Sequence, residues 1–253
     1  MRQYFQIFLV VLLLVISASD TFAQKSQSIP FPKVGLDIGT ADTPEDVSTT
    51  LQILLLMTIL SLAPSILIMT TSYLRLIIVF HFLKTALGTQ SMPPSQLLAG
   101  IALFITFFIM APTFNKINDE ALQPLMNGQM KVEEAMDKGI QPLREFMLNN
   151  VRDEDIALFV EMAAIEMPES RLELPTYILL PAFSISELRA GFIIGFFIFI
   201  PFLMVDMIIA SILLSMGMMM IPPMMISLPF KILLFILIDG WSLIIGSVIR
   251  SFG

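Results

Sequence analysis

The sequence contains no cysteine and one histidine, and only 14% of its 253 residues are charged. Without thiols the chain can form neither a disulfide nor a thiolate metal site, and His81 alone leaves little for metal chemistry. The net charge of −7 argues against a nucleic acid partner, because phosphate backbones bind basic surfaces. No nucleophile elbow, phosphate-binding loop or metal-ligand set occurs. We therefore expect no catalytic residue, no cofactor and no metal.

Apolar residues are abundant instead, at 56% of the sequence, and the mean hydropathy is +0.85. Soluble domains are about a quarter charged, so this composition is typical of an integral membrane protein. Irregular backbone survives in a membrane only where protein or a cavity surrounds it. The sequence therefore predicts an all-α membrane protein built from kinked apolar helical hairpins.

The first 23 residues have the three parts of a secretory signal peptide: basic Arg2, a short apolar run over 7–16, and a small residue at the end. We predict cleavage between Ala23 and Gln24. An uncleaved anchor is the alternative, although the run is short for a membrane span. Prolines and glycines then predict a flexible periplasmic lead-in over 24–50.

The first apolar hairpin is expected over residues 51–112. Its first helix, 51–71, is long enough to cross a membrane and contains Pro64, which should kink it. Three basic residues follow: Arg75, His81 and Lys84. By the positive-inside rule they place the next loop in the cytoplasm, which agrees with an exported N-terminus. The return helix is expected to end at Pro112.

Acidic residues concentrate over 113–186, between the two apolar parts. Segments 132–137, 143–150 and 155–165 mix acids with apolar residues at helical spacing. Such charge usually lies on a solvated helix face, and an ion site is the less favoured alternative. We expect an extracytoplasmic helical module on the periplasmic side.

The second apolar hairpin is expected over 187–253. Gly217 and the pair Pro222–Pro223 interrupt it, so a turn joins its two helices. The tip of this turn carries Met218, Met219 and Met220. Methionine is flexible and polarizable, so a cluster at a constriction suits a seal that fits different shapes. The alternative is that these side chains only fill an irregular core.

Charges inside the apolar segments are costly and usually mark a partner or a pathway. Asp206 lies 14 residues before Met220 and Lys231 lies 11 residues after it, so their depths differ by about one helical turn. We predict an ion pair between them, with a proton relay through Asp206 as the alternative. Arg75 and Asp239 are the other candidate intramembrane charges. An aspartyl protease is excluded because Asp239 would lie about 7 Å deeper than Asp206, too far to share a proton.

Glycines at 191 and 195 form a G-x-x-x-G motif near the start of the second hairpin. This spacing lets another helix approach closely. Taken alone the motif is weak, and crowding by phenylalanine explains it equally well.

Several segments together resemble the FliP family of flagellar type III export-gate subunits. The segments are Pro181–Phe196, Ser215–Pro223, Ile226–Lys231, Asp239–Trp241, Thr71–Arg75 and Leu87–Gln90. The resemblance runs from about residue 51 onward. One departure is Ile193, where the family often has a polar or basic residue.

The resemblance implies a ring of five copies in the inner membrane at the flagellar basal body, partly on the periplasmic side. It implies the small FliQ and FliR subunits, FlhB and FlhA as partners, membrane lipid around the assembly, and unfolded rod, hook and filament proteins as cargo. It assigns Met218, Met219 and Met220 to a gasket around the pore. It also implies that other components supply the energy, so the subunit itself is expected to be no enzyme. Related injectisome subunits share the motifs, and a small-solute or ion transporter is the alternative from another class.

Overall fold

A computed structural model describes residues 44–89, 92–218 and 220–252. The chain divides into two units, Met1–Ile53 and Leu54–Gly253, and every contact below lies within the second. The expected signal peptide, its expected cleavage site at Ala23 and Gln24, and most of the expected lead-in lie outside the described residues.

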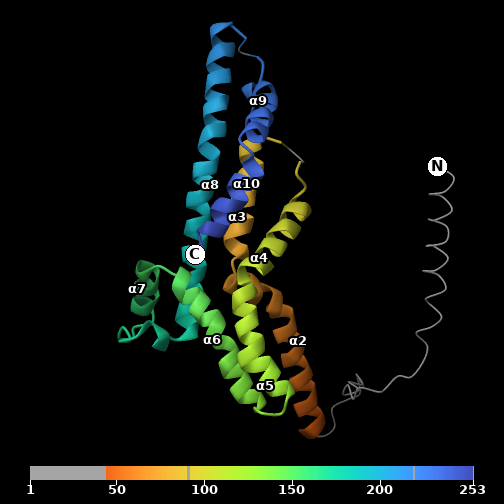
Figure 1. The fold of residues 1–253 in the computed structure, drawn as a ribbon, viewed down its shortest axis with the longest axis vertical. Coiled ribbons are helices and arrows are strands. Elements are labelled where there is room, and N and C mark those ends of the chain that lie inside the picture. Colours follow the sequence, from red (N-terminus) through yellow and green to blue (C-terminus); the bar gives the residue numbers. More distant parts are fainter. Residues whose placement is uncertain (1–43, 90–91, 219, 253) are drawn as a thin grey trace, which may run out of the picture. The chain divides into compact units, whose positions relative to one another are not determined.

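Most of the described residues are helical and none forms a strand, which confirms the all-α prediction (Figure 1). The α-helices are α2 (Pro44–Thr70), α3 (Tyr73–Leu87), α4 (Ser95–Ile117), α5 (Gln123–Met126), α6 (Val132–Asn150), α7 (Asp153–Met162), α8 (Thr176–Ser215), α9 (Pro223–Leu237) and α10 (Gly240–Arg250). A π-helical turn, η2 (Asn118–Leu122), joins α4 to α5, and a 3₁₀ turn, η3 (Arg171–Glu173), precedes α8.

Within the described residues, three helical stretches are long and apolar enough to cross a membrane: Leu51–Thr70, Ser95–Met126 and Thr176–Ser215. The pair α9 and α10 would form a fourth span that is bent by 63° at its break. These helices expose much of their apolar surface to the surroundings. The structure thus agrees with an integral membrane protein.

Three expected helix boundaries are wrong. The return helix does not end at Pro112, because α4 continues through it to Ile117. The two segments expected over 132–150 are one helix, α6, which continues through Pro142. Helix α8 begins at Thr176, well before the expected second hairpin. A proline removes one backbone hydrogen bond and bends a helix, but packing and neighbouring groups can carry the helix past it.

The first hydrophobic cluster forms around α3. Leu76, Val79, Phe80 and Leu83 recur at helical spacing and are all fully buried. Residues from α4, α8, α9 and α10 complete the cluster, among them Leu98, Phe202, Phe235, Ile244 and Val248. Helix α3 therefore packs against α4, α8 and α9, and Figure 1 shows it alongside α8.

The contact between α3 and α8 depends on the glycines of the G-x-x-x-G motif. A Cβ at Gly191 would lie 3.1 Å from the side chain of Ile78, and a Cβ at Gly195 would lie 2.5 Å from the ring of Phe82. Phe82 in turn packs edge-on against Phe192, with ring centroids 5.5 Å apart. Close helix approach and phenylalanine crowding thus occur at the same place.

The second hydrophobic cluster joins α6 and α7 to the first turns of α8. It includes Met147, Ile156, Leu179 and Phe183, all buried. Polar contacts fix the same junction, because Ser186 donates to Asp155 at 2.6 Å. The acidic module is therefore packed onto the start of the long apolar helix.

Buried Arg144 of α6 holds the segment that leads into α8. Its guanidinium donates to the carbonyl oxygens of Leu172 at 2.9 Å and Leu174 at 2.6 Å, and also bonds the hydroxyl of Thr176. The two carbonyls precede α8 and the hydroxyl belongs to its first residue, so one side chain contacts three points where the chain enters this helix. Arg144 thereby fixes the direction in which α8 starts.

Candidate functional site

The methionine turn begins where α8 ends in a left-handed glycine. The amide of Gly217 donates to the carbonyl of Leu214 at 3.0 Å, and the amide of Met218 donates to that of Leu213 at 3.0 Å. These two hydrogen bonds, together with Gly217 at φ 72°, form a Schellman motif, which ends the helix. Pro223 then starts α9, a position where a missing amide hydrogen is harmless.

Methionine side chains of this turn are largely exposed. Met220 is 96% exposed and Met218 is also exposed, while Met219 lies outside the described residues. Further exposed methionines flank them: Met216, Met224 and Met225. In this chain they do not fill a core, because they have no packed neighbours comparable to those of the buried clusters. The turn is thus an apolar, adaptable surface that no other described residue of the chain covers.

The structure brings Asp206 and Lys231 together below this turn. Lys231 Nζ lies 2.6 Å from Asp206 Oδ2, and the side chain of Lys231 is 4% exposed while that of Asp206 is 25% exposed. The other carboxylate oxygen, Oδ1, accepts a hydrogen bond from Ser227 at 2.5 Å. The pair joins α8 to α9 across the hairpin, at the depth that residue counting from Met220 indicates.

Lys231 also reaches a third helix. Its ammonium donates to the carbonyl oxygen of Ala86 at 3.0 Å, in the last turn of α3. That turn ends at Gly88, which is left-handed with φ 72°. Carbonyls at a helix C-terminus lack helical partners and carry partial negative charge, so a cation is favoured there. Lys231, in the middle of α9, therefore links α8 and the C-terminal end of α3 through one buried charge.

Arg75 has a buried partner that the sequence did not reveal. Its guanidinium forms a two-pronged pair with Glu187 of α8, with Nε 2.9 Å from Oε2 and Nη2 bonded to Oε1. Glu187 is fully buried. Nη1 donates to the carbonyl and the hydroxyl oxygen of Ser251, both at 2.8 Å. The only signal available in the sequence was one carboxylate beside an apolar run, within the segment that resembles the family.

The sequence predicted that Asp239 lies within an apolar helix, and the structure places it outside one. It lies between α9 and α10 in the left-handed region, with φ 49°, and it is exposed. Gly240 follows it and packs so closely against Phe235 that a Cβ would lie 2.2 Å from the ring. The second helix of the hairpin expected over 187–253 is accordingly broken here, with a bend of 63° between α9 and α10. Among the described residues no cation lies within ion-pair distance of Asp239.

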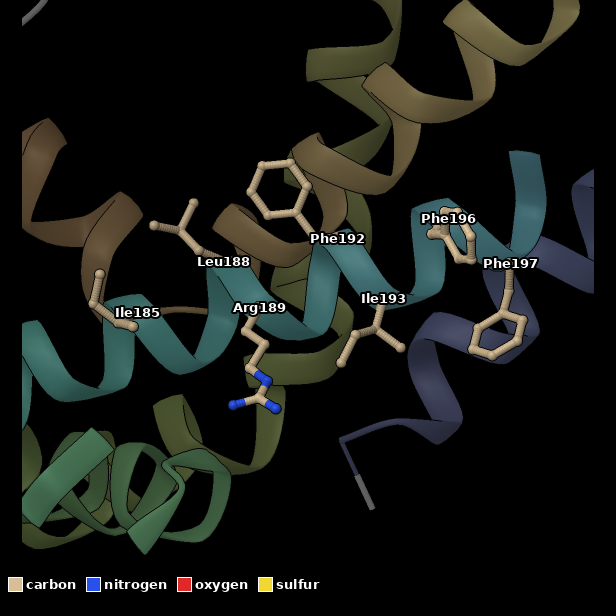
Figure 2. A pocket seen from close by; sticks show the side chains of 7 residues that line it. All are labelled: Ile185, Leu188, Arg189, Phe192, Ile193, Phe196 and Phe197. Carbon is tan, nitrogen blue, oxygen red and sulfur yellow. The ribbon is translucent and has the colours of Figure 1, made fainter. Parts of the chain in front are cut away.

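One face of α8 forms a shallow hollow between the two clusters. Figure 2 shows its lining side chains, all from α8, with Arg189 and Phe192 pointing to different sides of the helix. The lining is apolar except for Arg189 and consists of Ile185, Leu188, Arg189, Phe192, Ile193, Phe196 and Phe197. The apolar Ile193, which departs from the family pattern, thus lies on an apolar face.

No group of three metal-ligating side chains occurs among residues 44–89, 92–218 and 220–252. The two buried ion pairs lie between helices, with their charges engaged by protein groups. The arrangement can hold helices in register and present an apolar tip.

A comparison with known families matches the model of the FliP family over residues 56–248. The chain belongs to the FliP family. The flagellar biosynthetic protein FliP of Bacillus subtilis is 55% identical over 217 residues, which cover 86% of this chain and 98% of that protein. That of Caulobacter vibrioides is 48% identical, with 87% and 82% covered, and that of Borreliella burgdorferi is 42% identical over the whole of both chains. The resemblance read from the sequence motifs is therefore confirmed.

Proposed function

We propose that this FliP-family chain is a core subunit of the flagellar type III protein export gate. In this proposal it contributes to the inner-membrane channel through which unfolded rod, hook and filament proteins leave the cytoplasm. Family membership and the membrane-capable helices support this role. The subunit supplies structure, while other components supply the energy.

The observation that carries the proposal is the exposed methionine turn. Met218 and Met220 stand on a turn between two apolar helices, bounded by Gly217 and Pro222. Three consecutive residues of a helix would point about 100° apart, whereas a turn lets them converge. Repeated around a ring, which the resemblance puts at five copies, they form a crowded apolar constriction. Ions avoid such a constriction, because charge is costly to bring into a dry passage.

Partners follow from the same proposal. The ring includes FliQ and FliR and is contacted by FlhB and FlhA, and the acidic module lies on the periplasmic side at the basal body. The exposed apolar surfaces of α2, α4 and α8 are suited to cover by neighbouring subunits or lipid. In this arrangement the two buried ion pairs keep each subunit rigid while its methionines move.

Replacing Met218, Met219 and Met220 together with alanine tests the seal. We expect the gate to assemble and to export flagellin at reduced or near-normal level, while the membrane leaks ions or a normally excluded solute. Thioethers have many rotamers of low energy, so alanine leaves a gap that native methionine fills. The measurement is membrane conductance beside flagellin secretion.

A matched control replaces three exposed methionines elsewhere: Met126, Met136 and Met162. This variant should remain tight. If the membrane of the turn variant also stays impermeable while secretion stops, the methionines belong to the transport machinery or the fold, and the proposal that they form a seal is refuted. A deletion strain that retains motility but loses uptake of a solute would instead support a transporter.

A further inference from the structure

Phe252 contacts both hydrophobic clusters. It packs against the first cluster, around α3. Its ring also stacks on Phe146 of α6, with centroids 6.0 Å apart and planes 21° apart. Phe146 in turn packs against the second cluster and meets Phe183 edge-on at 5.9 Å. A single side chain after α10 thus bridges the two parts of the buried interior.

The same ring covers the buried ion pair. The guanidinium carbon of Arg75 lies 3.6 Å from the centroid of Phe252, within the range of a cation–π contact. Ser251, the preceding residue, accepts two hydrogen bonds from Arg75 Nη1. The other two guanidinium nitrogens, Nε and Nη2, donate to the carboxylate of Glu187. Arg75 is therefore enclosed by Glu187 on one side and by Ser251 and Phe252 on the other.

Backbone contacts set the position of these two residues. The amide of Ser251 donates to Ser247 at 3.2 Å, and the amide of Phe252 donates to Ile249 at 3.1 Å. They thus continue the last turn of α10. That helix is itself anchored in the first cluster by Ile244 and Val248. The position of Phe252 is therefore fixed by its attachment to α10.

We propose that Ser251 and Phe252 form a clasp that couples the α6–α7 module to the apolar helices. An ion pair in a dry interior is stable only when its remaining hydrogen-bonding groups are satisfied and water is kept away. The clasp meets both needs, through the Ser251 oxygens and the Phe252 ring. Because the ring also stacks on α6, opening it exposes the Arg75–Glu187 pair and loosens α6 at the same time.

Hydrogen exchange on the purified full-length chain in detergent tests this coupling. Phe252→Leu keeps an apolar side chain and removes the aromatic face, whereas Phe252→Tyr keeps that face. We expect Phe252→Leu to lower the protection of amides in both α3 and α6, on the order of ten-fold, and Phe252→Tyr to retain it. Phe104→Leu, on an exposed phenylalanine of α4, is the matched control and should change neither helix.

Two results would overturn the clasp. One is a loss of protection confined to α10, which means that Phe252 stabilises only its own helix end. The other is equal damage by Phe252→Tyr and Phe252→Leu. If Phe252→Leu does not accumulate in cells, accumulation replaces exchange as the measurement: normal levels of Phe252→Tyr support the clasp, and equally low levels refute it.

Discussion

The pair of Asp206 and Lys231 allows a quantitative test, because its two members are buried to different extents. Replacing Asp206 with leucine leaves an ammonium that is 4% exposed, with the Ala86 carbonyl as its remaining acceptor. Such an uncompensated buried charge costs about 3–5 kcal/mol of folding free energy. Replacing Lys231 with methionine leaves a carboxylate that is 25% exposed and still bonded to Ser227. That loss should be smaller, about 1–3 kcal/mol.

The double variant Asp206→Leu with Lys231→Met removes both charges and keeps much of the side-chain volume. Replacing a buried pair with hydrophobic residues is often neutral or stabilising, so the double variant should be more stable than Asp206→Leu alone. The assay is the thermal unfolding midpoint of the detergent-purified chain. At about 2–4 °C per kcal/mol for a chain of this size, Asp206→Leu lowers it by roughly 6–20 °C.

The control is the surface pair Glu134 and Lys138, one turn apart on α6 with side chains 55% and 51% exposed. Removing the charges of this pair should lower the folding stability by only about 0.3–0.5 kcal/mol. The reasoning fails if the double variant of Asp206 and Lys231 is no more stable than the worse single variant. It also fails if Lys231→Met lowers the unfolding midpoint more than Asp206→Leu does, since burial of the remaining charge then does not determine the loss of stability.

Three further predictions concern packing, topology and processing. Gly195→Ala should cost about 1–3 kcal/mol through its clash with α3, whereas Gly100→Ala, with open space around it, should be neutral or stabilising in the same unfolding assay. Cysteines at Asp137 and Asp153 should react with an impermeant thiol reagent in whole cells before assembly; labelling only after the inner membrane is opened would contradict a periplasmic module. N-terminal sequencing should find cleavage after Ala23, and a protein that begins at Met1 would exclude it.

Residue counting was sufficient for contacts across a hairpin. Asp206 and Lys231 are 25 residues apart and flank one turn, so helical rise alone places them at similar depth. Arg75 and Glu187 are 112 residues apart, and no local period relates them. Their pairing follows from the packing of α3 on α8, which only the three-dimensional structure shows.

Helix boundaries at proline were the least predictable feature. Pro112 and Pro142 lie inside helices although each removes one backbone hydrogen bond, so neither proline marks a helix end. The break at Asp239 has the opposite origin. No proline marks it, and the left-handed backbone of a non-glycine residue is not evident from composition. The sequence therefore predicted the helices well and the points where they end or bend poorly.

The length of α8 has a consequence for the single chain. Its 40 residues rise about 60 Å, roughly twice the hydrocarbon thickness of a bilayer. Exposed apolar side chains occur near both of its ends, including Tyr177 and Ile212. Whichever half of α8 lipid surrounds, the other half presents apolar groups to water. We therefore propose that neighbouring proteins cover that remainder, in addition to the lipid that surrounds the rest of the helix.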